Sequence, residues 1–197
     1  MLTNVDATSA READQAAIER VQAGEGDAFR TLVERYSRPL FALAYRITGN
    51  EADADDVVQE SFIRAYRGLS QYDGRAGFQA WISRIASNYA LDLLAAKRRR
   101  NWEQIDGDGE HAGALESVPA GGASPERLAL NSQLRLHVEA AMGGLTDLER
   151  TAFVLRHFEG LSLEEIGGTL GISLNSVKQG VFRAVQKMRV ALRPVAG

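Results

Sequence analysis

Residues 162–178 read SLEEIGGTLGISLNSVK and contain the signals for two short-range helix starts and one helix end. Ser162 and Glu165 have the spacing of a capping box, in which a hydroxyl and a carboxylate each satisfy an exposed backbone donor at a helix start. Gly171 can end that short helix, because glycine tolerates the left-handed conformation found there. Ser173 then caps a longer helix. The stretch therefore predicts a helix-turn-helix.

The neighbouring residues extend this pattern in both directions. Thr146 and Glu149 form a second capping-box pattern, which opens a helix that stops near Gly160. The last helix carries the basic residues Lys178, Arg183, Lys187, Arg189 and Arg193, and no acid follows Glu165. A helix-turn-helix lays its second helix in the major groove of DNA. An ordinary three-helix packing unit is the alternative, but the basic bias falls on the helix that would enter the groove.

Residues 12–100 also predict helices, because Ala, Leu, Arg and Glu dominate and strand-like alternation is absent. Asp27 is a candidate N-cap for a helix that we expect Pro39 to interrupt. A second helix is expected over about 51–67. A loop over 68–77 then precedes a long helix from Phe78 to about Arg99.

Residues 101–125 are rich in Gly and Pro, and their apolar residues show no period. Six acids and no base lie in residues 101–126, namely Glu103, Asp106, Asp108, Glu110, Glu116 and Glu126. Such a segment cannot offset the entropy of ordering it. We therefore expect an all-α fold of two small helical domains, 12–100 and 126–193, joined by a flexible acidic linker over 101–125. The second domain carries the helix-turn-helix.

Composition excludes several classes of function. The chain has 197 residues, 45% of them hydrophobic and 25% charged, which is typical of soluble folded domains. It has no cysteine, and its three histidines share no metal-ligand spacing, so we expect no metal and no cofactor. No apolar run is long enough to span a membrane and no signal-peptide pattern is present, so a cytoplasmic location is expected. No catalytic set appears, so we expect no enzyme and no small-molecule substrate.

Three segments carry a resemblance to a known family. They are residues 53–66 (DADDVVQESFIRAY), 78–88 (FQAWISRIASN) and 158–166 (FEGLSLEEI). In this order, around an acidic linker, the chain resembles the extracytoplasmic-function (ECF) sigma factors of bacterial RNA polymerase, in the sigma-70 family. The resemblance covers about residues 12–193. It implies a region 2-like first domain, a region 4-like second domain and a role in transcription initiation.

The resemblance assigns the acidic segment to docking on the β′ clamp helices of core RNA polymerase. The expected polymerase-binding residues are Asp53, Asp55, Asp56, Val57, Gln59, Glu60 and Phe62. An acidic helix with apolar positions suits a basic, partly apolar partner. The alternative is a solvated helix start, where negative charge is favourable.

The resemblance also places recognition and melting of the −10 element in the loop before the long helix and in that helix. Members of the group hold a flipped base at this loop, where stacking and edge hydrogen bonds retain it. The expected residues are Tyr72, Asp73, Arg75, Trp81, Arg84, Asn88, Lys97, Arg98, Arg99 and Arg100. The last four would contact phosphates; alternatively, they form a solvated helix end. The position of Trp81 favours the core over a stacking platform, because Ile82 and Ile85 share its helical neighbourhood.

The −35 element would be read by the last helix. The expected residues are Ser173, Asn175, Ser176, Lys178, Gln179, Arg183 and Lys187, of which Arg183 and Lys187 are better placed for the DNA backbone. Gly180 departs from the family, which usually has Arg at this position. We expect it to weaken the helix and to remove a DNA-contacting cation. Gly167 and Gly168 likewise replace better helix formers.

The implied partners are core RNA polymerase, through its β′ clamp helices and β flap, promoter DNA and an anti-sigma factor. The acidic linker would thread toward the RNA exit path. Two alternatives stay open: a dimeric helix-turn-helix repressor or activator that works without polymerase, and a sigma-like decoy that only binds proteins.

Overall fold

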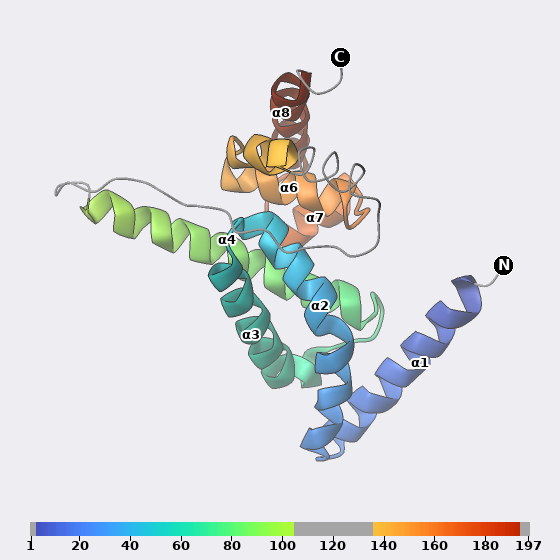
Figure 1. Ribbon diagram of the computed structural model, residues 1–197. Coiled ribbons are helices and arrows are strands. Elements are labelled where there is room, and N and C mark those ends of the chain that lie inside the picture. Colours follow the sequence, from blue (N-terminus) through green and yellow to red (C-terminus); the bar gives the residue numbers. More distant parts are fainter. Residues whose placement is uncertain (1–2, 105–135, 194–197) are drawn as a thin grey trace, which may run out of the picture. The chain divides into compact units, whose positions relative to one another are not determined.

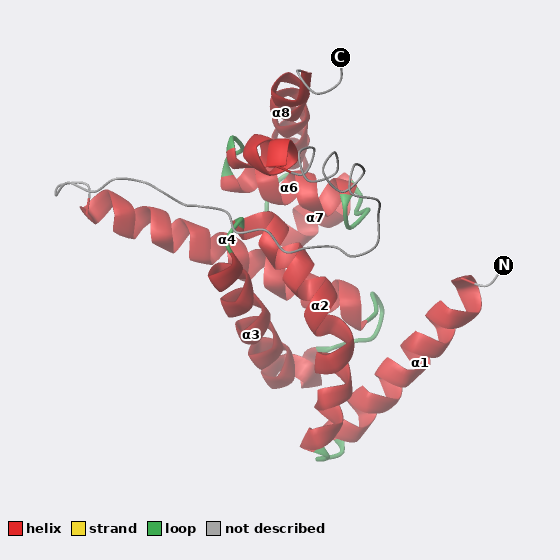
Figure 2. Cartoon of the chain, viewed as in Figure 1, coloured by secondary structure: helices red, strands yellow, loops and turns green. Residues whose placement is uncertain are grey.

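The computed structural model describes residues 3–104 and 136–193 (Figure 1). Within these ranges every regular element is helical and no strand is present (Figure 2), as the sequence predicted. None of the described helices is both long and apolar enough to cross a bilayer. The predicted linker lies outside the described residues from 105 onward, as does the expected start of the second domain at 126.

The chain divides into two compact units, which are described separately. The first comprises Met1–Arg46 and Glu51–Ala90, and the second comprises Ile47–Asn50 and Leu91–Gly197. The helices before the linker are α1 (Thr3–Gln22), α2 (Phe29–Thr48), α3 (Glu51–Gly68) and α4 (Phe78–Gln104), with the short 3-10 helices η1 (Gly26–Ala28) and η2 (Leu69–Gln71). After the linker, residues 136–143 are helical, and α6 (Asp147–His157), α7 (Leu163–Leu170) and α8 (Leu174–Leu192) follow.

Helix α2 runs through Pro39 without a break, so the expected interruption is wrong. Proline removes one backbone hydrogen bond, but the Pro39 side chain is exposed, on the face of α2 where water can satisfy the carbonyl that is left free. The opposite face is an unbroken apolar stripe that continues past the proline, and its buried members are Leu32, Tyr36, Leu40, Leu43 and Ile47. Burial of this stripe outweighs one lost hydrogen bond. The N-cap expected at Asp27 is also wrong, because Asp27 lies inside η1.

Helix α1 was not expected, because its sequence is polar and shows little periodicity. It is held by a buried carboxylate: Asp14 is 5% exposed, accepts a hydrogen bond from the Tyr36 hydroxyl and forms an ion pair with Arg35. Burial, with the neighbouring Asp14 charge, raises the pKa of Tyr36 far above its usual value. Ile18, only 2% exposed, adds apolar contact. A few long-range contacts therefore stabilise α1, which the local sequence pattern does not predict.

An aromatic network fills the first unit. Phe29 makes edge-to-face contacts with Phe62, Tyr66 and Phe78, at centroid distances of 6.2, 5.1 and 6.4 Å. Phe78 in turn lies 5.8 Å from Trp81. Such geometry is favoured by the ring quadrupoles, and each pair adds about 1 kcal/mol beyond area burial. The network links α2 and α3 to the start of α4.

The second unit follows its local signals closely. Thr146 and Glu149 form the predicted capping box of α6, and Ser162 and Glu165 form that of α7. Gly171 ends α7 at φ +64°, in the left-handed region, and the Ser173 side chain caps α8 by accepting from the Ser176 backbone. The helix-turn-helix is therefore confirmed.

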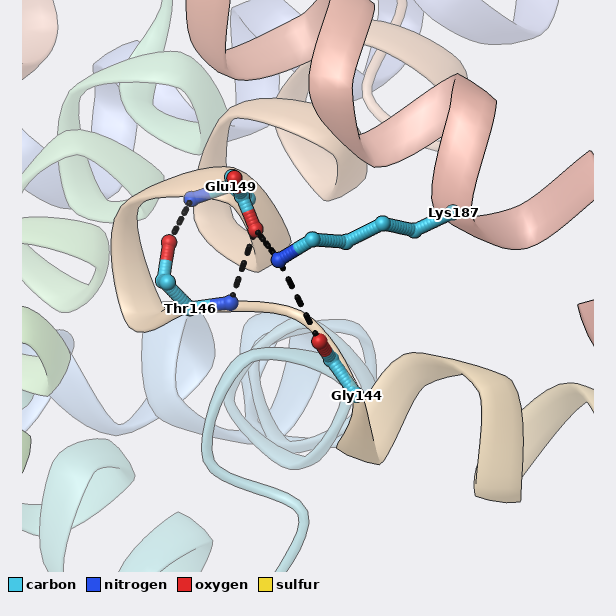
Figure 3. A network of polar contacts seen from close by, with 4 residues as sticks. All are labelled: Gly144, Thr146, Glu149 and Lys187. Atoms are coloured by element: carbon cyan, nitrogen blue, oxygen red, sulfur yellow. Dashed lines mark hydrogen bonds and ion pairs between the residues drawn. The ribbon is translucent and has the colours of Figure 1, made fainter. Parts of the chain in front are cut away.

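A polar network joins the two ends of this unit (Figure 3). The Lys187 Nζ atom on α8 lies 2.6 Å from Glu149 Oε2 and 3.4 Å from the Gly144 carbonyl oxygen. The same Glu149 oxygen accepts from the Thr146 backbone N–H at 3.0 Å. Burial acts to raise the pKa of Glu149, but the hydrogen bonds from Lys187 and Thr146 prevail and hold that pKa below its usual value. Glu149 thus has two roles: it caps α6, and it binds Lys187 of α8.

Candidate nucleic-acid and protein interfaces

The acidic segment forms the first half of α3. Asp55, Asp56 and Gln59 are exposed, and Glu60 is half-buried. The structure instead buries Asp53, Val57 and Phe62, which are 5%, 0% and 8% exposed. These three were expected at the polymerase interface, but they pack inside the molecule because they share the face of α3 that carries Ala54, Ser61 and Ala65. In the first half of α3 the exposed side chains of the predicted interface are therefore polar or acidic, and Val58 is half-buried.

Glu60 already has a partner in the chain. Its Oε1 atom accepts from Arg64 Nε at 2.8 Å, one helical turn further on. The Arg64 guanidinium carbon lies 4.5 Å from the centroid of the Tyr89 ring on α4, a cation–π contact. Glu60 thus lies at the edge of the acidic surface. Its carboxylate binds Arg64, which in turn contacts α4.

The loop before α4 spans Tyr72–Gly77. Its tip is a small turn in which Asp73 accepts a hydrogen bond from the Arg75 backbone N–H at 3.1 Å. The Asp73 carboxylate also lies 3.5 Å from Arg75 Nε, and both side chains are well exposed. The Tyr72 ring is half-buried, 5.1 Å from Trp81 and 6.1 Å from Phe78. Burial and the Asp14 and Asp73 charges raise the pKa of Tyr72 above its usual value.

Three of the residues expected at the −10 element share one face of α4. Trp81, Arg84 and Asn88 are spaced i, i+3 and i+7, which places them on one stripe of a helix. Arg84 is exposed, whereas Trp81 and Asn88 are half-buried. Trp81 contacts the ring of Tyr72 and that of Phe78. It is therefore part of the core and also supports the loop.

The basic cluster lies inside α4 rather than at its end. Arg98, Arg99 and Arg100 are exposed and Lys97 is half-buried, while the helix continues to Gln104. The last turn of α4 holds no basic residue. Favourable interaction with the helix dipole is confined to the last turn, so it does not account for this cluster.

The N-terminal half of α8 presents a polar surface. Asn175, Lys178 and Gln179 are exposed there, and their spacing places them on one face of the helix. Arg183 is exposed one turn further on and donates to Gln179 Oε1 at 2.9 Å. Ser173 and Ser176 are the cap and its hydrogen-bond partner. Lys187, also expected at DNA, has its ammonium group bound to Glu149.

Gly180 does not lie on this polar surface. It is buried, and a Cβ placed on it would lie 3.8 Å from Ala152 Cβ on α6. The expectation that Gly180 removes a cation from the DNA-facing side is therefore not supported. Gly167 is also more than a weak helix former, because a Cβ there would lie 3.1 Å from the Ile172 carbonyl oxygen. A small residue is needed for the close approach of α7 to the turn.

Sequence reasoning missed one exposed residue on the same part of α8. Phe182 is 64% exposed and follows Lys178 and Gln179 by one helical turn. The signal was present, because a large apolar residue stands among polar ones at that spacing. Phenylalanine can contact the methyl group of thymine in the major groove.

The described residues are helical and include a capped helix-turn-helix whose second helix has a polar face. These features are typical of one class, the DNA-binding transcription proteins. Residues 32–100 match the Sigma-70 region 2 family, and residues 141–190 match the Sigma-70, region 4 family. The chain is 37% identical over 194 residues to RNA polymerase sigma-H factor of Pseudomonas aeruginosa, covering 94% of this chain and 96% of that protein. It is 36% identical over 187 residues to the ECF RNA polymerase sigma-E factor of Escherichia coli K12, covering 92% and 95%.

Solved structures agree with these matches. The chain superposes on CnrH, solved in complex with the cytosolic domain of CnrY, with a TM-score of 0.57 and 27% identity over 91% of this chain and 97% of that one. It shares the fold of the sigma factor RpoE of Bartonella quintana, solved with the anti-sigma factor NepR, with a TM-score of 0.63 and 22% identity over 84% and 96%.

The chain belongs to the sigma-70 family, as an extracytoplasmic-function sigma factor. Sigma factors are transcription initiation factors and not enzymes, which agrees with the expectation that this chain carries no catalytic site.

Proposed function

We propose that this sigma factor binds core RNA polymerase through α3, reads the −10 element with the Tyr72–Gly77 loop and α4, and reads the −35 element with α8. The observation that carries the proposal is the capped helix-turn-helix, whose second helix exposes Asn175, Lys178 and Gln179 near its N-terminus. Amide and ammonium groups at these positions can donate to base edges in the major groove. Arg183 would contact the DNA backbone.

Docking on the polymerase would use the outward face of α3. Asp55, Asp56 and Gln59 are exposed there without a hydrogen bond or ion pair to another described residue. An acidic face of this kind suits a basic partner such as the β′ clamp helices, and charge complementarity would speed association. Val57 and Phe62 support this face from inside, so we leave them out of the contact surface.

Melted −10 DNA would lie over the loop and α4. Asp73 and Arg75 at the loop tip offer an acceptor and a cation, while Trp81 supports the ring of Tyr72 from below. Arg84 and Asn88 extend this surface along α4, and the exposed residues Arg98, Arg99 and Arg100 would contact phosphates.

Control would come from an anti-sigma factor. CnrH, at 27% identity, was solved with the cytosolic domain of CnrY, and this resemblance supports a protein partner for the present chain as well. A factor that works with RNA polymerase acts in the cytoplasm, and we place this chain there.

The docking surface is tested by reversing its charge. Replacing Asp55 and Asp56 with lysine should weaken binding to core polymerase at least tenfold, because two exposed acids become repulsive toward a basic partner. Binding of the free sigma factor to DNA should not change. Glu34→Lys, a reversal of another exposed acid on α2, is the control and should bind polymerase normally. Equal loss of polymerase and DNA binding would indicate a folding defect and refute the assignment.

The −35 assignment has its own test. Replacing Lys178 with alanine should weaken promoter binding by the holoenzyme and reduce the slope of log K against log salt by about 0.9, the value for one lost contact to duplex phosphate. An unchanged slope with an altered base preference would instead show that Lys178 reads a base edge.

A further inference from the structure

One face of α1 follows the loop that precedes α4. Arg11, Gln15, Ile18 and Gln22 are spaced i, i+4, i+7 and i+11, so their side chains form a single stripe along the helix. Ile18 is buried and 2% exposed, whereas Arg11 and Gln15 are exposed. The stripe is therefore apolar at its centre and polar toward the N-terminus of α1.

One hydrogen bond and two close approaches to glycines show that this stripe runs antiparallel to the segment from η2 to α4. Gln22 Nε2 donates to the Leu69 carbonyl oxygen at 3.0 Å. A Cβ on Gly74 would lie 3.9 Å from Gln15 Oε1, and a Cβ on Gly77 would lie 4.0 Å from Arg11 Nε. As the segment advances along the chain, its partner on α1 moves back toward the N-terminus. The electrostatic influence of Arg11 and Asp14 on the Tyr72 hydroxyl agrees with this arrangement.

The position of α1 is fixed from another face. Asp14, one residue before Gln15, is buried and bound to Arg35 and Tyr36 on α2. Arg35 also donates to the Ala10 carbonyl oxygen at 2.9 Å. These contacts hold α1 against α2 next to Arg11. The Arg11 side chain therefore lies beside the loop.

Arg11 is a second exposed cation beside this loop, in addition to Arg75 at the loop tip. Arg75 is engaged with Asp73 within the loop. Arg11, by contrast, makes no ion pair or hydrogen bond with any residue whose side chain the structure describes. An exposed guanidinium with unused donors is suited to bind a phosphate oxygen.

We propose that Arg11 binds a phosphate of the single-stranded DNA held by the Tyr72–Gly77 loop, so that α1 completes the −10 binding surface. Residue 11 lies outside the segment 32–100 that matches Sigma-70 region 2, so the family match does not assign this contact. The inference rests on the proposed function of the loop. It predicts an added phosphate contact that positions the strand and reads no base.

The test uses holoenzyme and a fork-junction DNA whose single-stranded part is the non-template strand of a promoter that the holoenzyme transcribes. Arg11→Ala should weaken binding about three- to fivefold and lower the slope of log K against log salt by about 0.7, the value for one phosphate of a single strand. Arg11→Lys should keep most of the slope, because it keeps the charge. Arg20→Ala is the matched control: Arg20 lies on the same helix and pairs with Glu25 at 2.8 Å.

Neutral methylphosphonate groups, introduced one at a time in the single strand, locate the contact. One such substitution should weaken wild-type binding and have no further effect on Arg11→Ala. If Arg11→Ala binds like wild type, or stays sensitive to every substitution, this inference fails alone. If wild-type holoenzyme does not bind the fork junction, the proposed function of the loop fails and the inference falls with it.

Discussion

The helices before the linker and those after it are stabilised by different kinds of contact. In α6–α8 the decisive hydrogen bonds are local: the caps at Thr146, Ser162 and Ser173 each join residues three apart. In α1–α4 they are distant, since Asp14 meets Arg35 and Tyr36 across 21 and 22 positions, and Gln22 meets Leu69 across 47. The helix-turn-helix is thus specified by signals within its own sequence, whereas α1–α4 depend on contacts between residues that are far apart in the sequence.

The largest expected effect comes from removing the buried carboxylate of the first unit. Asp14→Ala leaves Arg35 and the Tyr36 hydroxyl without their partner, and Arg35 is partly exposed, so we expect a loss of about 2–3 kcal/mol. Hydrogen exchange should rise throughout α1 and leave α6–α8 unchanged.

A neighbouring substitution provides the control. Ala13→Ser changes an exposed residue of α1 and should leave exchange unaltered. If Asp14→Ala raised exchange in α6–α8 as much as in α1, the two units would not be independent and the comparison would be wrong.

A smaller loss is expected from the long-range ion pair between α8 and α6. Lys187→Met keeps the aliphatic stem of Lys187 but leaves Glu149 buried without its cation, which should destabilise α6–α8 by about 1–2 kcal/mol at pH 7. Binding of promoter DNA should keep its salt slope, because the ammonium group is paired with Glu149. A reduced slope would show that Lys187 contacts phosphate after all.

The same pair sets a pH dependence. The pKa of Glu149 is lower in the folded protein than its ordinary value of 4.5, so its contribution to stability is present above that value. The contribution is lost as the pH falls through the folded pKa. Thermal unfolding of wild type and Lys187→Met should therefore differ most near neutral pH and converge below about pH 4.5. A constant difference across this range would contradict the role given to Glu149.

The smallest effects concern two glycines of the second unit, and they have opposite signs. Gly167→Ala should destabilise the helix-turn-helix by about 1 kcal/mol, because its Cβ would crowd the Ile172 carbonyl oxygen. Gly180→Ala should stabilise it by about 0.5–1 kcal/mol, because its Cβ would meet Ala152 at ordinary contact distance and glycine is a poor helix former. Stabilisation by both would show that the turn does not need a small residue.

Much of the second unit could be predicted because a cap is a short-range pattern, and the capping boxes and Gly171 lie where the sequence placed them. In the first unit the helix from Glu51 was predicted, but α1 and the passage of α2 through Pro39 were not, because both depend on distant partners. The sequence also could not separate Asp55, which is exposed, from Val57, which is buried, as contact residues. That distinction requires knowing which face of α3 packs against the molecule.

We propose that this chain directs core RNA polymerase to promoters. The most direct measurement is co-elution of the purified chain with core polymerase, followed by run-off transcription from a library of candidate promoters. Our account predicts a stable complex and transcripts whose templates share one motif near −10 and another near −35. A chain that neither co-elutes with polymerase nor yields any promoter-directed transcript would contradict it.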